Sequence, residues 1–333
     1  RRRALVQALE AHRRAGADPH IGGAVDLRAS VARAEKGGVL DGTALHDCAE
    51  TLRAVERVGS ALAGGGTILE GLAQRLDPLR GLRGELERSV GADGTLTDAA
   101  SPILGGLRAH QRLTVERLRT RLETLAHARA YSPYLQEAIV TVRNGRYVLP
   151  VRAEAKSKVP GIVHDSSATG QTVWIEPLEV VELGNSAREA EAAVHAEEAR
   201  ILGALSQRVA GEAPALRSNI EALAELDLAA ATAAFAKAIE QDATATPAYL
   251  NLGDLRQRAQ NLPGAIEAWE ALTVAVPERA YLAFSRLERA YTDTGRPQRF
   301  AELCRRLIER NPQDWRARVA LADHLSRAGQ HRP

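Results

Sequence analysis

The chain has 333 residues, of which 45% are hydrophobic and 26% charged, so it has enough apolar side chains for packed cores and is not a disordered chain. Lys and Arg number 44 against 42 Asp and Glu, which excludes a polycation that binds nucleic acid along its whole length. Any such binding must come from a local cluster. At roughly 100–200 residues per domain, the length predicts two or three domains.

The cysteines and the hydropathy pattern exclude further classes of protein. Cys48 and Cys304 lie far apart without a CxxC partner, which argues against a disulfide framework or a zinc site and suits a reducing compartment. No apolar run reaches the roughly 18 residues of a membrane span, and the first residues, RRRALVQALE, lack the apolar core of a signal peptide. We therefore expect a cytoplasmic protein with no cofactor, no metal and no membrane partner.

Residues 1–136 have the pattern of several helices separated by glycine-rich connections. The last of these helices, predicted over residues 101–130, carries aliphatic residues at spacings of three and four from Val115 to Leu125. Charged side chains cover its other faces. We predict a helical core and a long helix, which we call the lever.

The period of the pattern changes in residues 139–151, IVTVRNGRYVLPV. Two alternating apolar runs flank Asn144 and Gly145, which is the strongest local signal for a hairpin with a two-residue turn. In that register Arg143 and Arg146 lie opposite each other. Like charges in opposed positions cost roughly 0.2–1 kcal/mol, so the pairing suggests an anion that binds there.

Two more short β-rich runs follow the hairpin, at residues 161–164 and 171–175, with the turn-forming DSSATG between them. We therefore predict a β-rich insert over residues 137–182. Residues 183–228 return to a helical pattern with one apolar stripe. Two long helices that bracket a β unit are typical of an antiparallel coiled pair with the sheet at its tip.

Basic residues gather around the predicted hairpin, within sixteen residues that contain Glu154 as the one acidic residue. Backbone phosphates attract such a cluster without any particular base geometry. The alternative is that these are solvated charges that keep an exposed sheet edge from pairing with another chain. The candidate nucleic-acid-binding residues are Arg143, Arg146, Arg152, Lys156 and Lys158.

His164, Asp165 and Ser166 include all the residue types of a hydrolase triad. Neighbours on a strand point to opposite faces, and no glycine-flanked nucleophile turn is present, so we expect no catalytic relay among them. His164 is predicted to end a strand while Asp165, Ser166 and Ser167 form hydrogen bonds with the turn backbone. Trp174, between aliphatic neighbours, is predicted to pack in the core of the insert, and Glu176 to end a strand before a helix.

Residues 229–333 contain an internal repeat. Pro277 aligns with Pro312, and Phe235 aligns with Trp269. Both alignments give a repeat period of about 34–35 residues. Small residues beside each aromatic side chain allow paired helices to approach closely. We predict a short solenoid of tetratricopeptide repeats.

The segments VRNGRYVLPV and PGIVHDSSATG, together with residues 34–40, 93–108 and 222–228, resemble the second type of bacterial MutS. The resemblance covers roughly residues 1–235. It implies that the helices are a core and lever and that the β insert is the clamp that reaches nucleic acid. It also implies binding of branched DNA that restrains recombination, or action on stalled ribosomes.

The chain also departs from that family. It has no GxxxxGK[ST] loop, since KGGVLDGT and GIVHDSSATGQT both lack the lysine that reaches the phosphates, and it has no nuclease motif. We therefore expect a protein that is not an enzyme and lacks the family's ATPase. In place of the ATPase stands the repeat segment, which is similar to the repeats of lipopolysaccharide assembly protein B without its CxxC tail.

Together these observations predict a mainly α protein, with a helical core, long lever helices, a small β clamp and an α-solenoid. The first functional hypothesis is a MutS-like clamp that binds nucleic acid, branched DNA before RNA. The alternatives are a protein-interaction scaffold that acts through its repeats, or a ribosome- or RNA-binding quality-control factor. The partner of the repeats and a homodimer remain open.

Overall fold

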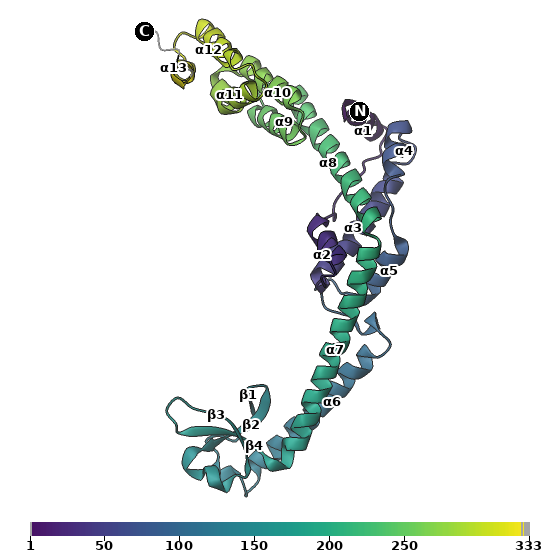
Figure 1. Cartoon of the computed structure of the whole chain (residues 1–333), viewed down its shortest axis with the longest axis vertical. Coiled ribbons are helices and arrows are strands. Elements are labelled where there is room, and N and C mark those ends of the chain that lie inside the picture. Colours follow the sequence, from purple (N-terminus) through teal and green to yellow (C-terminus); the bar gives the residue numbers. More distant parts are fainter. Residues whose placement is uncertain (1, 328, 330–333) are drawn as a thin grey trace. The chain divides into compact units, whose positions relative to one another are not determined.

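The computed structural model describes residues 2–327 and 329. The described residues are mostly helical, and they include one antiparallel sheet of four strands (Figure 1). The prediction of a mainly α chain with a small β insert is therefore confirmed. None of the helices in these residues is long and apolar enough to cross a lipid bilayer.

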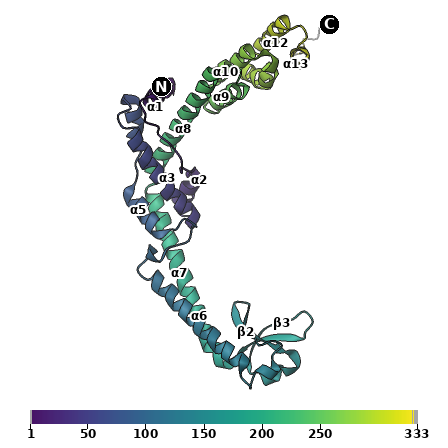
Figure 2. The same cartoon turned by 180° about the vertical axis from the view of Figure 1, so that it is seen from behind.

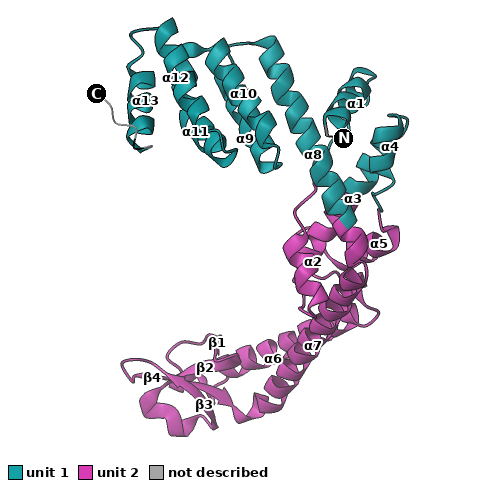
Figure 3. Cartoon of the chain, turned by 45° about the horizontal axis from the view of Figure 1, so that its top comes forward, with its two compact units in different colours: residues 1–22, 54–77, 218–333 teal, residues 23–53, 78–217 magenta. Residues whose placement is uncertain are grey.

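The chain divides into two compact units, which Figure 3 shows in different colours. Unit 1 comprises residues 1–22, 54–77 and 218–333, and unit 2 comprises residues 23–53 and 78–217. Two of the four divisions fall inside helices, α3 (Gly42–Ala61) and α8 (Ala213–Gln241), and the other two fall in the connections at residues 22/23 and 77/78.

Unit 2 is built around two long helices, α6 and α7, which pack side by side (Figures 1 and 2). Leu118 and Leu122 of α6 are buried, and α7 buries small residues such as Ala187 and Ala190, so the two backbones can approach closely. The helices of unit 2 outside α3 and α8 are α2 (Arg28–Glu35), α5 (Arg80–Ser89), α6 (Leu104–His127) and α7 (Val181–Gly211), and its short 3-10 helices are η1 (Asp98–Ala100), η2 (Ser132–Tyr134), η3 (Ala153–Lys158) and η4 (Leu178–Val180).

The four strands join in the order β1-β2-β4-β3, and every neighbouring pair is antiparallel. The predicted hairpin is confirmed, because Arg143 pairs with Arg146 and the two turn residues, Asn144 and Gly145, have φ of 51° and 71°. A two-residue turn of this type requires positive φ at both positions, which asparagine and glycine tolerate best. The strands are β1 (Thr141–Arg143), β2 (Arg146–Arg152), β3 (Gly161–Ser166) and β4 (Thr172–Pro177).

One face of this sheet is packed against the end of α6. Leu149, Val151 and Ile175 from the sheet share a buried cluster with Leu122 and Leu125 of the helix. We call residues 141–177, which hold all four strands and η3, the sheet region. On the other face Val148 and Glu176 are also buried, whereas Arg152 and the turn residues Asn144 and Gly145 are exposed.

The base of the sheet region is also fastened by polar groups. The Tyr131 hydroxyl donates to Glu179 at 2.9 Å, and Arg121 of α6 pairs with the same carboxylate at 2.6 Å. Burial raises the pKa of the Tyr131 phenol, and its hydrogen bond to Glu179 raises it further. The sheet region thus holds its α6 contact through both apolar packing and ion pairing.

In unit 1, the N-terminal helix α1 packs against α4. Leu5 and Leu9 of α1 are buried, and the His12 Nε2 atom lies 2.7 Å from the Ala61 carbonyl oxygen. Arg75 and Glu225 form a further ion pair at 2.5 Å. The bounds of these two helices are Arg2–Arg14 for α1 and Thr67–Ala73 for α4.

The C-terminal helices of unit 1 pack each against the next in chain order. Trp269 is fully buried, and a Cβ atom at Gly253 would lie 2.1 Å from its Nε1 atom, so glycine is needed where α9 meets α10. Phe284 and Phe300 meet edge to face at 5.8 Å. That these helices form tetratricopeptide repeats stays a prediction. They are α9 (Thr246–Arg258), α10 (Leu262–Ala275), η5 (Pro277–Ala283), α11 (Phe284–Asp293), α12 (Gln298–Arg310) and α13 (Trp315–Arg327).

Candidate nucleic-acid interface

Arg143 lies on the face of the sheet region that does not pack against α6. Its guanidinium carbon is 4.4 Å from the centroid of the Trp174 ring, and its Nε atom is 3.8 Å from an oxygen of Asp165. A cation over an indole face at a partly exposed site contributes roughly 0.5–1 kcal/mol. The prediction that Trp174 packs in the core of the insert is wrong, because its strand neighbours Val173 and Ile175 take the core face and it points the other way.

Arg146, its partner across the hairpin, is held differently. Its Nη1 atom is 3.3 Å from Oε1 of Glu176 and 3.0 Å from the side-chain oxygen of Asn185 on α7. Glu176 is only 1% exposed, so its carboxylate requires a cation or hydrogen-bond donors close by. The charge of Arg146 is therefore already balanced inside the protein.

His164 completes this arrangement. Its Nε2 atom is 2.7 Å from Oε2 of Glu176, so both carboxylate oxygens have a partner. His164 lies in β3 at a shift of register between Val163 and Asp165, where it has no partner residue across the strands. It does not form a relay with its chain neighbours, since Asp165 instead accepts a hydrogen bond from the Ser166 backbone N–H at 2.8 Å. The prediction that His164 ends a strand is wrong, because β3 continues to Ser166 and Asp165 pairs with Trp174 within it.

The helix α7 approaches this carboxylate closely at a glycine. A Cβ atom at Gly184 would lie 2.2 Å from Oε1 of Glu176, which is too close for any other residue without a shift. On the far side, the Asn144 amide donates to the His164 carbonyl oxygen at 2.9 Å and so ties the turn to β3. We call the polar cluster of the buried Glu176 with the partly buried Arg146, His164 and Asn185, with Gly184 beside it, the Glu176 joint.

The other three predicted residues are exposed. Arg152 ends β2, while Lys156 and Lys158 belong to the short helix η3 that follows it. Among the described residues, none of these three side chains has an ion-pair partner. Arg152 faces Thr172 and Pro150 faces Trp174, so Arg152 shares the outer face with the Trp174 ring.

The structure thus separates the five predicted residues into groups. Arg152, Lys156 and Lys158 are exposed and have no ion-pair partner within residues 2–327 and 329, Arg143 is stacked and partly exposed, and Arg146 is neutralised in the Glu176 joint. Contact of any of the five with nucleic acid stays a prediction.

Sequence reasoning missed two residues that shape this surface. Glu176 was interpreted only as a strand end, although its place on the strand beside β2 and β3 brings it to both His164 and Arg146. Arg188 of α7 was not considered, yet its Nη2 atom would lie 3.4 Å from a Cβ atom at Gly145. Its position one helical turn after Gly184 was the available signal, because residues four apart share a helix face.

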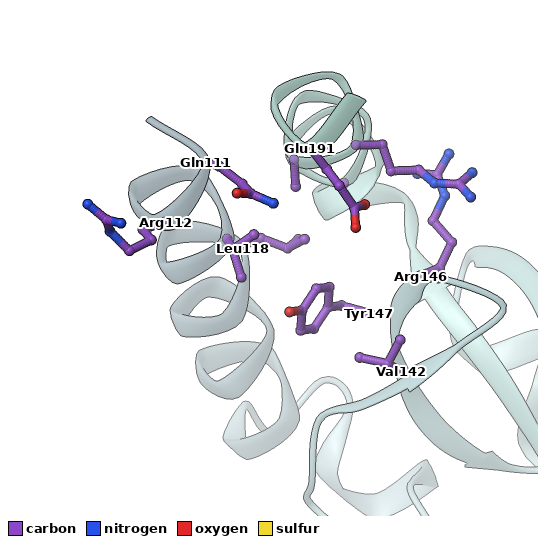
Figure 4. Close-up of a pocket in the computed structure, with 12 residues that line it drawn as sticks. Gln111, Arg112, Leu118, Val142, Arg146, Tyr147 and Glu191 are labelled. Atoms are coloured by element: carbon purple, nitrogen blue, oxygen red, sulfur yellow. The ribbon is translucent and has the colours of Figure 1, made fainter. Parts of the chain in front are cut away.

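A cavity of about 420 Å³ opens between α6, α7 and the hairpin. In Figure 4 the Tyr147 ring and Leu118 form its apolar side, Gln111 and Glu191 point into it, and Arg112 extends away from it. Gly145, Arg146 and Arg188 also line the cavity, at the hairpin turn. The lining thus combines apolar side chains from α6 and the hairpin with the charged groups of Arg146, Arg188 and Glu191.

Comparison with known proteins places these features in context. No protein-family model matches the chain. It is 43% identical over 213 residues to endonuclease MutS2 of Symbiobacterium thermophilum, which covers 63% of this chain and 27% of that relative. It is 38% identical over 242 residues to endonuclease MutS2 of Geobacillus thermodenitrificans (71% and 30%). With endonuclease MutS2 of Thermomicrobium roseum the identity is 40% over 223 residues (65% and 28%).

The chain is thus related to MutS2 proteins over about two thirds of its length. It spans less than a third of the length of these curated relatives. The comparison also corrects the expectation that the protein is not an enzyme, because the relatives are named endonucleases. That expectation depended largely on the missing phosphate-binding loop, which bears on ATP hydrolysis and not on nuclease chemistry.

Proposed function

We propose that this chain binds nucleic acid through its sheet region, as the DNA clamp of a MutS2-related protein, with branched DNA as the preferred ligand. The observation that carries the proposal is the group of three exposed cations, Arg152, Lys156 and Lys158, without ion-pair partners among the described residues. The logarithm of the binding constant falls linearly with the logarithm of the salt concentration, and each phosphate contact makes this slope steeper by roughly 0.9. Three such contacts are enough for a steep and measurable dependence.

The sheet region suits this function because its backbone, which carries the basic side chains, is held in place by the rest of unit 2. The inner face is buried on α6, and the Glu176 joint fastens the hairpin to α7. A rigid support lowers the entropy lost on binding. The relatedness to proteins named endonuclease MutS2 supports a role with DNA, and we extend it to a role in restraining recombination in the cytoplasm.

The test is fluorescence anisotropy of the full chain with four-way-junction DNA, plain duplex and structured RNA over a range of salt concentrations. We expect the junction to bind most tightly, with affinity that falls steeply as salt rises. The triple variant Arg152→Glu/Lys156→Glu/Lys158→Glu should lose at least a hundredfold in affinity at low salt, because three attractions become repulsions.

A matched control separates a local contact from a change in net charge. Arg258, Arg305 and Arg310 of unit 1 are also exposed and form no ion pair in the described part of the chain. Their triple change to glutamate alters the net charge equally and should leave affinity within a few fold. Equal losses in the two triple variants, or no binding at low salt, would refute the proposal.

A second candidate is a protein-interaction scaffold that uses the C-terminal helices. Trp315 of α13 is 60% exposed, and the Arg316 guanidinium lies 4.4 Å from the Tyr281 ring and 4.9 Å from the Trp315 ring. Exposed aromatic and arginine side chains are enriched at protein interfaces. This function predicts indifference to nucleic acid and no effect of the sheet-region triple variant, so the same anisotropy series distinguishes the two.

A further inference from the structure

Three guanidinium groups surround the two-residue turn of the hairpin, and they differ in how their charge is balanced. Arg146 pairs with the buried Glu176 at 3.3 Å, and Arg143 lies 3.8 Å from Asp165. Arg188 comes from α7 and is exposed, with no ion pair in the part of the chain that the structure describes. The turn therefore carries one unbalanced positive charge beside two balanced ones.

The position of this third guanidinium is set by the fold. Gly184 and Asn185, one turn earlier on α7, are in contact with the Glu176 joint, and the joint also holds Arg146 at the first position of β2. The helix and the hairpin are thus fastened together immediately beside Arg188. Its Nη2 atom lies next to Gly145, where the missing side chain leaves the turn backbone uncovered.

We infer that Arg188 and the hairpin turn at Asn144 and Gly145 form a phosphate-binding site, which in the proposed function takes a phosphodiester group of the bound strand. A guanidinium binds phosphate through two parallel N–H donors, and it is the side chain preferred for such recognition. Arg146 and Glu176 act as positioning residues, because they fix the turn and α7 relative to each other.

The neighbouring cavity limits where the phosphate can lie. Glu191 lines the same cavity of about 420 Å³, and its carboxylate repels an anion from the interior. The apolar part of the lining is formed by Val115 and Leu118 of α6 and by Val142 and Tyr147 of the hairpin. The phosphate therefore binds at the rim, against Arg188 and the turn.

The first measurement is the salt dependence of junction binding for the full chain and three variants. Arg188→Ala should weaken binding about tenfold at low salt and reduce the salt slope by about one phosphate contact. Arg188→Lys should keep the slope, because the charge remains. Arg117→Ala, which removes an exposed arginine of α6 that has no ion pair among the described residues, should change neither quantity.

The second measurement does not depend on nucleic acid. Inorganic phosphate is titrated into the full chain while the backbone amide signal of Gly145 is followed by NMR. We expect a saturable shift in the wild-type chain that is absent in Arg188→Ala and unchanged in Arg117→Ala.

The outcomes separate this inference from the proposed function. If the chain binds the junction and Arg188→Ala binds with the same affinity and slope, the inference is wrong while the proposed function stands. If no nucleic acid binds but phosphate shifts the Gly145 amide in an Arg188-dependent way, the site is established and the proposed function fails. No effect in either measurement refutes the site.

Discussion

The sheet region and the C-terminal helices differ in what holds them in place. The C-terminal helices interlock through apolar side chains, with Trp269 and Phe300 buried in one continuous cluster. The sheet region has an apolar cluster of its own against α6, but its hairpin is also fastened to α7 beside one buried carboxylate, Glu176, with a partner on each oxygen. Apolar packing is distributed over many contacts, whereas a polar joint depends on each of its members. The hairpin, which we propose binds phosphate, should therefore be more sensitive to a single substitution in the Glu176 joint than the C-terminal helices are to the loss of one apolar contact.

The largest effect should come from removing the central aromatic side chain of the C-terminal helices. Trp269→Ala empties a fully buried site and should lower the free energy of unfolding of unit 1 by about 3–5 kcal/mol. Chemical denaturation followed by circular dichroism measures the loss. Junction binding by the sheet region should persist under native conditions, and a parallel loss of binding would show that the two regions are not energetically separate.

The next change adds a single methyl group to the polar joint. Gly184→Ala places a Cβ atom 2.2 Å from the Glu176 carboxylate, so the helix or the strand must move, at a cost of about 1–3 kcal/mol. Gly203→Ala is the matched control, because it lies on the same helix with open space around it and should be neutral or stabilising. Unfolding by urea provides both values. Similar results for the two variants would show that the close approach at Gly184 has no energetic importance.

The stacked pair on the outer face should contribute less. Arg143→Ala removes the cation over Trp174 and should cost about 0.5–1 kcal/mol. In a chain that retains Trp174 as its only tryptophan, through Trp269→Phe and Trp315→Phe, the change should also alter the emission of that indole. Arg143→Lys retains a cation and should give an intermediate result, whereas identical spectra for all three would contradict the stacking.

Within the sheet region, some features could be predicted from the sequence and others could not. The hairpin was predictable to the register, because Asn144 and Gly145 are residues that tolerate positive φ. The five basic residues were predictable as a cluster, but the neutralisation of Arg146 was not. That depends on Glu176, which lies thirty residues later in the chain and reaches Arg146 only once β2 and β4 are paired. Trp174 was misplaced although strand alternation was available from the sequence, because its neighbours Val173 and Ile175 are buried on one face and its ring therefore lies on the other, beneath Arg143.

The smallest predicted effect is a dependence of stability on pH in the long helix α7. Arg200 donates two hydrogen bonds to Glu197, and these lower the pKa of the Glu197 carboxyl from its ordinary value of about 4.5 to about 2. A depressed pKa contributes stability above the ordinary value, and this contribution disappears as the pH falls toward 2. Glu197→Gln should therefore flatten the acid side of the stability curve between about pH 4.5 and 2 and leave stability at pH 7 only slightly lower. Glu189→Gln, at an exposed position on the same helix, serves as the control and should follow the wild-type curve. Melting temperatures measured over this pH range decide the matter, because an unchanged acid limb in Glu197→Gln would mean that the ion pair does not contribute to folding stability.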